Sequence, residues 1–431
     1  MEGLEDRIHN QKNFRICCST HGIFDGWCLR EIWERENGYW RKFINDPANV
    51  SYQFPSLGES VYLNDQFKLL RKPSICQDMF WADDGTSIVT VHDDYGIRQF
   101  LIPEWDSENK LMVPFTRFFR NQSVMTSKVH HKYSLFNDTQ EYNVILLGTR
   151  NLPLQLLPLQ SNDADVGTLQ SYNVIDKSNE TYLVPYALSF NGDRQFLAGF
   201  KRNKVSLYDL TRSQAVLSTG HTKQQCGRSI QKNIVSCFDQ QSFHGGFAET
   251  TRTFGTYKNE LYLFDRRIPD SKLLYRSREG RGLTQILKSL NGHYSYLIRR
   301  NSNKIEILDA RQSFAKVNEL KLPKKLSNQN MKACITRSGG LSIGTYHGTI
   351  VNWSKELIEF GGIERDSKAG EAPIPAEGEI QLNLPNSNVN VVNQSPIDEE
   401  IYAVSYSPDK SIEEPTGQER SGILIMENYP E

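Results

Sequence analysis

The chain has 431 residues, of which 38% are hydrophobic, 11% aromatic and 23% charged, and its formal net charge is −1 at pH 7. This balance argues against a protein that coats nucleic acid by bulk charge, because such domains are usually strongly basic. No stretch approaches the roughly 18 apolar residues of a membrane span, and no signal-peptide core occurs. The seven cysteines are irregularly spaced, with no CxxC, which is typical of reduced thiols in an intracellular protein.

The first 49 residues differ in kind from the rest, because 1–49 hold three of the six tryptophans and three of the seven cysteines. We interpret them as an aromatic-rich N-terminal extension to the main domain. Five of their apolar residues are spaced to share one face of a helix: Leu29, Ile32, Trp33, Trp40 and Phe43. The nearest approach to a metal-binding cluster lies here too, in Cys17, Cys18, His21 and Cys28, but we expect no metal because the CxxC spacing of zinc sites is missing.

From about residue 72 onward, short apolar runs alternate with turn signals, as in strand-rich proteins. Seven such units start near residues 76, 124, 183, 232, 282, 330 and 389. A repeat of roughly 50 residues is the period of a propeller blade, a four-stranded sheet that buries its faces only against neighbouring blades. The sequence therefore predicts an all-β, single seven-bladed β-propeller of the WD-repeat type over 50–431. We expect a strand within 50–65 to complete the seventh blade.

One hairpin pattern occurs three times in the sequence, which supports the blade interpretation. FLAGFKRNKVSLYDLTR at 196–212 is matched by TFGTYKNELYLFDRR at 253–267 and YLIRRNSNKIEILDAR at 296–311. Each copy places an Asn in the turn and an Asp six residues later, and we assign both to the blade structure because such carboxylates accept hydrogen bonds from turn amides. These residues are Asn203, Asn259 and Asn303 with Asp209, Asp265 and Asp309, and the sixth unit has Trp353, which is followed by Ser354 where a WD repeat has Asp. The repeats are degenerate WD repeats.

Residues 363–388 contain five acids against two bases with Pro, Gly and Ser, so we interpret them as an acidic, flexible insertion. No nucleotide-binding, zinc-protease, calcium-loop or serine-hydrolase motif occurs. The only close histidine pair, His130-His131, is interpreted as ordinary strand and turn residues. We therefore expect no enzymatic activity, no cofactor, no metal and no small-molecule substrate.

The segment TRFFRNQS at 116–123 combines two cations with two rings, in Arg117, Phe118, Phe119 and Arg120. Three interpretations stay open for it. Single-stranded RNA stacks on rings and binds guanidinium groups, protein partners favour the same residue types, and a plain blade strand would bury the rings.

Further basic clusters fall in turns, at Lys201, Arg202, Arg228, Lys232, Arg276, Arg278, Arg281, Arg299 and Arg300. Equivalent turns of a propeller share one rim, so these would form a positive stripe that binds RNA or a partner. The alternative is a turn that simply favours Asn and Lys.

The segments QDMFWADDGTSIVTVHDDYGIRQFLIP, VPFTRFFRNQS, RRNSNKIEILDAR and GTIVNWSKELIEFGG resemble a family of nuclear WD-repeat proteins of budding yeasts, which is in turn similar to the telomerase Cajal body proteins of metazoans. The resemblance covers about residues 72–431 and leaves the 70-residue leader without a counterpart. It implies a nuclear, non-catalytic scaffold, monomeric within a larger complex, that helps the first snRNP to pair with the 5′ splice site in pre-mRNA splicing. A second hypothesis is direct binding of a small nuclear or telomerase RNA as its chaperone.

Overall fold

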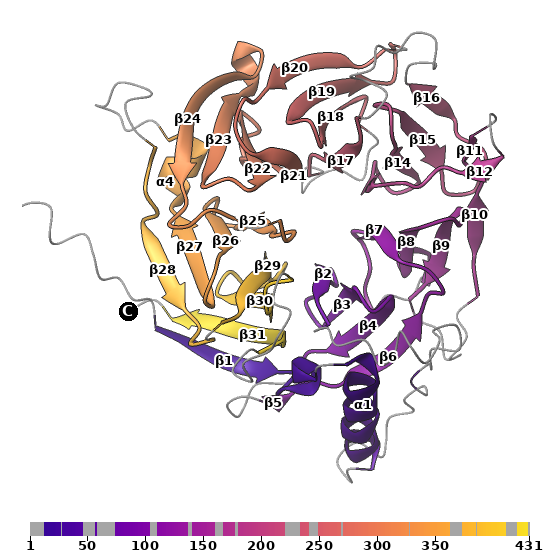
Figure 1. Ribbon diagram of the computed structural model, residues 1–431, viewed down its shortest axis with the longest axis vertical. Coiled ribbons are helices and arrows are strands. Elements are labelled where there is room, and N and C mark those ends of the chain that lie inside the picture. Colours follow the sequence, from indigo (N-terminus) through magenta and orange to yellow (C-terminus); the bar gives the residue numbers. More distant parts are fainter. Residues whose placement is uncertain are drawn as a thin grey trace, which may run out of the picture.

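Seven antiparallel sheets surround a common axis in the computed structural model, which confirms the predicted seven-bladed β-propeller (Figure 1). Six sheets have four strands, and the seventh has a fifth strand at its outer edge. The structure describes residues 13–26, 28–45, 57, 74–103, 110–136, 140–159, 167–176, 180–219, 233–240, 249–268, 270–326, 328–362, 373–384, 386–410 and 420–429.

The strands follow the chain from the axis outward within each blade. Blade 1 comprises β2 (Cys76–Trp81), β3 (Ser87–His92), β4 (Gly96–Leu101) and β6 (Pro114–Phe119). Blade 2 comprises β7 (Val124–Val129), β8 (Val144–Thr149), β9 (Leu154–Pro158) and β10 (Gln170–Tyr172). Blade 3 comprises β13 (Ala187–Phe190), β14 (Gln195–Gly199), β15 (Val205–Asp209) and β16 (Leu217–Thr219). The hairpin of β11 (Ile175–Asp176) and β12 (Thr181–Tyr182) lies between blades 2 and 3 in the chain.

The remaining blades repeat this order. Blade 4 comprises β17 (Val235–Phe238), β18 (Thr251–Thr256), β19 (Glu260–Asp265) and β20 (Lys272–Arg276). Blade 5 comprises β21 (Arg281–Lys288), β22 (Tyr294–Arg300), β23 (Lys304–Asp309) and β24 (Ala315–Lys321). Blade 6 comprises β25 (Ala333–Ile335), β26 (Leu341–Gly344), β27 (Thr349–Trp353) and β28 (Gly378–Gln381). Blade 7 comprises β29 (Asn388–Gln394), β30 (Ile401–Ser407), β31 (Gly422–Tyr429) and β1 (Asn13–Ser19), followed by β5 (Lys110–Leu111).

The core is divided among the junctions between blades, because each sheet has two buried faces. In β8, Ile145 and Leu147 pack in the cluster between blades 1 and 2, whereas Val144 and Leu146 pack in the cluster between blades 2 and 3. Successive side chains of a strand point to opposite faces of the sheet, so a strand buried on both faces needs apolar residues at consecutive positions. This explains the near-continuous apolar runs of the sequence.

The first strand of the chain completes the last blade, which corrects the expected closing strand within 50–65. Strand β1 pairs antiparallel with β31, from Asn13 opposite Tyr429 to Ser19 opposite Leu424. Residues 50–56 and 58–65 lie outside the described residues. Strand β5, from the loop between β4 and β6 of blade 1, then pairs in parallel with β1. Part of 1–49 is therefore a blade strand, and blade 1 adds to the sheet of blade 7.

Helices occupy few described residues. They are η1 (Ile23–Asp25), α1 (Leu29–Ile44), η3 (Gln140–Tyr142), η4 (Ala310–Gln312) and α4 (Lys355–Glu359). Helix α1 forms where the apolar spacing predicted it, and buries Leu29, Ile32, Trp33 and Glu36. No helix among the described residues is long and apolar enough to cross a membrane.

The expected acidic insertion at 363–388 is only partly separate from the blades. Residues 363–372 lie outside the described residues, but β28 pairs with β27 as the outer strand of blade 6. Ile380 is buried there between blades 6 and 7. The composition of this segment concealed the strand, because an outer strand needs only one apolar side chain facing the core.

Candidate binding surfaces

The two faces of the ring carry different side chains. We define the top face as the face formed by two kinds of segment, which are the loops between the second and third strands of each blade and the links from one blade to the next. The opposite face is formed by the loops that join the first strand to the second and the third strand to the fourth. Exposed cations of the described top-face loops, outside α1, are Arg150, Lys201, Lys258, Arg278, Arg281, Lys324, Lys325, Lys410 and Arg420. The exposed carboxylates of the same loops are Glu180 and Glu279. The described top-face loops therefore expose more cations than carboxylates, although the whole chain is nearly neutral.

The turn between β14 and β15 contributes one part of this positive face. Lys201 is exposed, and its ammonium lies 5.9 Å from the ring centroid of Tyr186. Arg202 has a left-handed φ of 64°, is half-buried, and lies 3.9 Å from the carboxylate of Asp176. Lys201 is the more available of the two cations, because Arg202 has an acidic neighbour.

Blades 4 and 5 contribute the other part. The guanidinium of Arg300 lies 5.4 Å from the ring centroid of Tyr257, whose side chain is 38% exposed. Arg278 is exposed in the link between these blades, and Arg281 is exposed at the start of β21. Arg276 is exposed as well, but it forms an ion pair of 2.6 Å with Glu260. Cations beside an exposed ring provide both charge and a stacking surface.

Two of the predicted cations do not join this surface. Arg299 is buried, donates to the hydroxyl of Ser277 and the carbonyl of Glu279, and lies 3.3 Å from Glu306. Its role is to hold the link between blades 4 and 5, so its interpretation as a partner contact is wrong. Arg228 and Lys232 lie outside the described residues.

The Arg and Phe residues of 117–120 also belong to the interior. Phe118 packs between blades 1 and 2, and Phe119 packs between blades 7 and 1. Arg117 is 3% exposed and forms an ion pair of 2.8 Å with Glu36. Arg120 is half-buried and donates to Gln155 at 2.5 Å. Of the three interpretations of this segment, the structure supports the buried blade strand and not a surface for RNA or protein.

A buried ionic network joins α1 to blade 1. Arg98 of β4 donates to Glu36 of α1 at 2.6 and 3.0 Å and to Asp94 at 2.6 and 3.0 Å. The indole of Trp33 donates to Asp94 at 3.1 Å. Burial alone would raise the pKa of Glu36, but Arg98 and Arg117 outweigh it and hold the pKa below its ordinary value. Burial likewise favours a higher pKa for Asp94, but Arg98 outweighs it and the pKa of Asp94 is lowered.

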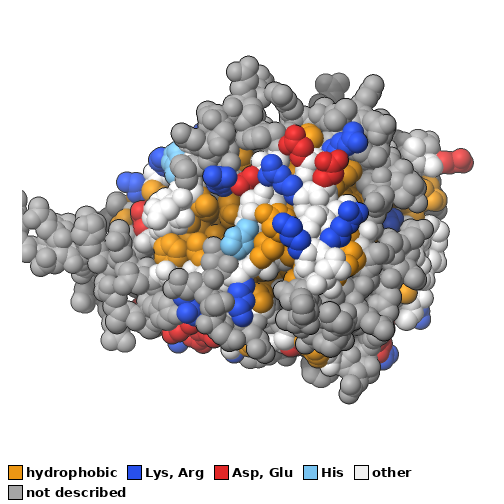
Figure 2. All heavy atoms as spheres, turned by 90° about the horizontal axis from the view of Figure 1, so that it is seen from below, with side chains coloured by type: hydrophobic (Ala, Val, Ile, Leu, Met, Phe, Trp, Pro, Cys, Tyr) orange, Lys and Arg blue, Asp and Glu red, His pale blue; other side chains and the backbone are white. Residues whose placement is uncertain are grey.

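The outward side of α1 remains polar. Arg30, Arg35, Arg41 and Lys42 are exposed, together with Glu31 and Glu34. Figure 2 looks onto this edge of the ring and shows basic side chains mixed with acidic and apolar ones. Helix α1 is thus anchored through one face and does not extend a uniform positive surface.

The repeated turn residues have structural contacts. The carboxylates of Asp209, Asp265 and Asp309 accept hydrogen bonds from the backbone N–H two residues later, at 2.9, 3.0 and 2.8 Å. Asn203 and Asn259 have left-handed φ angles of 56° and 60°.

Two further turn assignments need comment. In blade 5 the left-handed residue is Asn301, with a φ of 52°, and not Asn303, because this turn is built differently. Trp353 is buried and donates to the carbonyl of Pro375 at 2.9 Å, so it fixes the path from β27 to β28.

The face opposite the top face exposes large apolar side chains in addition to charged ones. Seven of the exposed large hydrophobic residues lie in its loops: Phe136, Leu169, Val216, Ile268, Leu290, Phe360 and Ile397. Phe136 is 74% exposed, Ile397 61% and Phe360 57%. Exposed apolar side chains gathered on one surface are typical of protein-interaction sites. No sequence pattern distinguished these residues from core residues, because apolar periodicity is interrupted in the loops.

One group of metal-ligating residue types converges among the described residues, formed by His130, His131 and Asp193. The backbone N–H of Lys132 donates to Nδ1 of His130 at 3.2 Å. The other nitrogen of His130, Nε2, therefore carries the proton and donates to the Asp193 carbonyl at 3.1 Å. The ammonium of Lys132 lies 2.7 Å from the Asp193 carboxylate. Both imidazole nitrogens of His130 and the acidic partner are therefore engaged, and the group fits a metal poorly.

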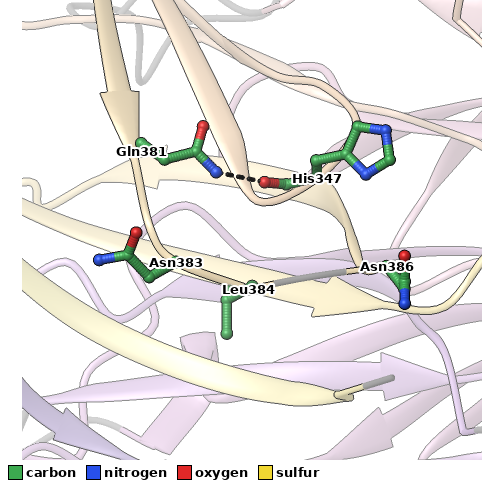
Figure 3. Close-up of a pocket in the computed structure, with 5 residues that line it drawn as sticks. All are labelled: His347, Gln381, Asn383, Leu384 and Asn386. Atoms are coloured by element: carbon green, nitrogen blue, oxygen red, sulfur yellow. Dashed lines mark hydrogen bonds between the residues drawn. The ribbon is translucent and has the colours of Figure 1, made fainter. Parts of the chain in front are cut away.

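An open hollow of about 460 Å³ lies on the top face of blade 6, lined by His347, Gln381, Asn383, Leu384 and Asn386 (Figure 3). The side-chain amide of Gln381 donates to the carbonyl of His347. His347, Asn383 and Asn386 have left-handed φ angles between 52° and 56°. The lining offers hydrogen bonds but no Lys or Arg, so the hollow is chemically separate from the positive surface. Four of its five lining residues, all except His347, fall within the supposed acidic insertion and therefore escaped prediction.

The chain has close relatives, although no family model matches it. Protein SWT21 of Zygosaccharomyces rouxii is 42% identical over 416 residues, which cover 95% of this chain and 96% of the relative. This chain belongs to the SWT21 family. Protein SWT21 of Vanderwaltozyma polyspora is 36% identical over 427 residues, covering 97% of this chain and 99% of the relative.

The alignments also bear on the leader. Because the Vanderwaltozyma polyspora SWT21 aligns with 97% of this chain, most of residues 1–70 have counterparts in that relative. The leader, which has no counterpart in the sequence resemblance, therefore has one in this member of the family. Protein SWT21 of Saccharomyces cerevisiae strain JAY291 is 37% identical over 352 residues, which cover 78% of this chain and 97% of the relative. Members of the SWT21 family thus differ in length.

Proposed function

We propose that this protein is a non-catalytic scaffold of nuclear pre-mRNA splicing that helps to assemble or stabilise the early complex between an snRNP and the 5′ splice site. The resemblance of its blade segments to nuclear splicing proteins supports this proposal. The observation that carries it is the chemical difference between the two faces, because a scaffold must hold unlike partners at the same time.

The apolar side chains of the face opposite the top face suit protein partners. Phe136, Phe360 and Ile397 are exposed on separate loops of blades 2, 6 and 7, so a partner would span that face. Aromatic and apolar anchors commonly dominate the binding energy of protein interfaces. The positive top face would then remain open to anionic components of the same assembly.

The test is affinity purification of the full chain from nuclear extract. We expect splicing proteins to be recovered with the wild type, and their yield to fall when Phe136, Phe360 and Ile397 are changed to Ser together. Leu273→Ser is the matched control, since Leu273 is 42% exposed but lies on the outer strand β20. Recovery of no splicing protein with the wild type would refute the proposal.

The positive top face favours a second candidate function, which is direct binding of a small nuclear or telomerase RNA. Lys258, Arg278 and Arg281 are exposed around the Arg300–Tyr257 pair. Phosphate contacts make RNA affinity fall steeply with salt, whereas rings provide stacking.

Crosslinking in vivo and salt-dependent binding of purified protein distinguish the two candidates. We expect Lys258→Gln, Arg278→Gln and Arg281→Gln together to weaken RNA binding and to flatten its salt dependence. The matched control changes Arg194, Arg212 and Arg337 to Gln, since these are exposed cations of the opposite face. Equal losses in both variants, or no RNA adduct in vivo, would leave only the scaffold function.

A further inference from the structure

A narrow pocket lies between blades 6 and 7, which are neighbours in the ring (Figure 1). Its volume is about 110 Å³, well above the ~10–15 Å³ that one water molecule needs. The mouth lies on the face opposite the top face, because it is formed by the loop from β25 to β26 and by the start of the connection from β27 to β28. The residues of the mouth are Thr336, Ser338, Gly340, Ser354 and Lys355.

The inner end of the pocket is apolar. Strands β27 and β31 run from the top face toward the mouth, so a residue early in either strand lies deeper than a residue near its end. Ile350 is the second residue of β27 and pairs with Ile380 of β28. Both pack with Met426 of β31 in the core between blades 6 and 7. This floor suits an aliphatic group.

The walls between the floor and the mouth are polar. Asn352 of β27 is half-buried, and its side-chain amide makes no hydrogen bond with a described residue. Asn428 of β31 has a buried Oδ1 without a hydrogen-bond partner among the described residues. The hydroxyl of Tyr402 is already engaged, since it accepts from Gln394 at 3.2 Å. A buried polar atom without a partner in the protein indicates a solvent molecule or a ligand.

The lining selects against a charged ligand. Lys355 is its only charged residue and is exposed at the mouth. A carboxylate or ammonium inside the pocket would therefore be buried without an opposite charge, which is costly. A peptide bond is uncharged and both donates and accepts, as the two free amides require.

The distance from the amides to the floor sets the size of the attached side chain. Asn352 and Asn428 each follow a floor residue of their own strand by two positions, or about 7 Å along the strand. A branched aliphatic side chain of leucine or isoleucine size spans this step and ends against the floor.

We propose that this pocket binds one aliphatic residue of an uncharged peptide segment of a protein partner. The side chain packs on Ile350, Ile380 and Met426, and the peptide bond binds the amides of Asn352 and Asn428. Phe360 and Ile397 are exposed on the same face, on the two blades that form the pocket. The proposal rests on the proposed scaffold function and deepens it, because it names the chemistry of the partner's anchoring residue.

The experiment is an NMR titration of the full chain, labelled at isoleucine and methionine methyl groups, with capped single amino acids. We expect N-acetyl-leucine N-methylamide to shift the methyl resonances of Ile350, Ile380 and Met426 with a Kd of about 1 mM, as is usual for a ligand of about a dozen non-hydrogen atoms. The capped glycine and glutamate should bind at least about tenfold more weakly, because one lacks the side chain and the other carries a charge. Equal binding of the three probes, or no binding of the leucine probe, would overturn the proposal.

Two variants locate the site, although the comparison of probes on the wild type does not depend on them. Asn352→Leu removes one amide and fills the pocket, so the leucine probe should no longer shift the three methyl resonances. Lys355→Gln is the control at the mouth and should leave the affinity for this uncharged probe unchanged. Unchanged binding in Asn352→Leu, or lost binding in Lys355→Gln, would overturn the proposal.

The probes also separate this proposal from the proposed function. They are free amino-acid derivatives, so their failure would reject the pocket and leave the scaffold function to the purification from nuclear extract. Recovery of no splicing protein in that purification would reject the scaffold function, while binding of the leucine probe would still establish the pocket.

Discussion

Two arginine-rich regions of this protein look alike in sequence and have opposite roles. Arg98 and Arg117 lie in blade 1 beneath α1, with side chains almost fully enclosed beside Glu36. Arg278, Arg281 and Arg300 lie on the top face of blades 4 and 5, beside solvent and Tyr257. The difference shows that burial and a carboxylate partner, not the residue type, decide whether an arginine holds the fold or remains available to a ligand.

The largest effect is expected from breaking the buried region. Glu36→Gln removes one carboxylate from two enclosed arginines, and breaking a buried pair in this way typically costs about 3–5 kcal/mol of unfolding free energy. Chemical denaturation measures this loss. The matched control is Glu34→Gln on the same helix, because its side chain is 68% exposed and, among the described residues, forms its ion pair with Arg30 in an i,i+4 contact. Similar losses in the two variants would contradict the assignment.

The pH dependence sharpens the same contrast. Burial, with help from Arg98, lowers the pKa of His92 to about 3, while Asp94 and Glu36 act in the opposite direction. The unfolded chain therefore binds this proton more tightly, and stability is lost as pH falls below the ordinary histidine value. Between pH 6.5 and 5 we expect a loss of about 2 kcal/mol from this group. Denaturation curves of the wild type and of His92→Gln at both pH values measure this loss. If the free energy of unfolding fell equally with pH in the wild type and in the variant, the assignment to His92 would be contradicted.

A smaller effect is expected at the repeated turn. Asp309→Ala removes the carboxylate that accepts from the N–H of Arg311 at the start of η4, and loss of such a cap costs about 1 kcal/mol. Asn303→Ala is the control in the same hairpin, since Asn303 is exposed and not in a left-handed conformation. In thermal unfolding experiments we expect a lower Tm for Asp309→Ala and an unchanged Tm for Asn303→Ala.

The smallest effect on stability is expected at the top face. Lys258→Gln, Arg278→Gln and Arg281→Gln should each change the free energy of unfolding by less than about 0.5 kcal/mol, because substitutions of exposed surface side chains usually have effects of this size. Chemical denaturation of the triple variant tests this. A loss of several kcal/mol would mean that these cations hold the ring and are not free for a partner.

The blades and their turns could be predicted because their signals are local. Apolar runs, turn residues and the repeated Asp each act within a few positions of one another. The environment of Arg117 could not be predicted, because its partner Glu36 is 81 residues away in the sequence and lies on a helix from another part of the chain. For the same reason the closing strand was placed in SYQFPSLGESVYL, which has a stronger strand pattern than NFRICCS, although the latter pairs with β31.

The pairing of β1 with β31 has a consequence for how the chain folds. Asn13 pairs with Tyr429, so this ladder joins residues that are more than 400 positions apart in the sequence. During synthesis the first strand leaves the ribosome early and must wait for the last one, with its backbone hydrogen bonds unmade. Because contacts of long sequence separation form slowly, we expect closure of the ring to be the late, rate-limiting event, and nascent chains to depend on protection of that waiting edge.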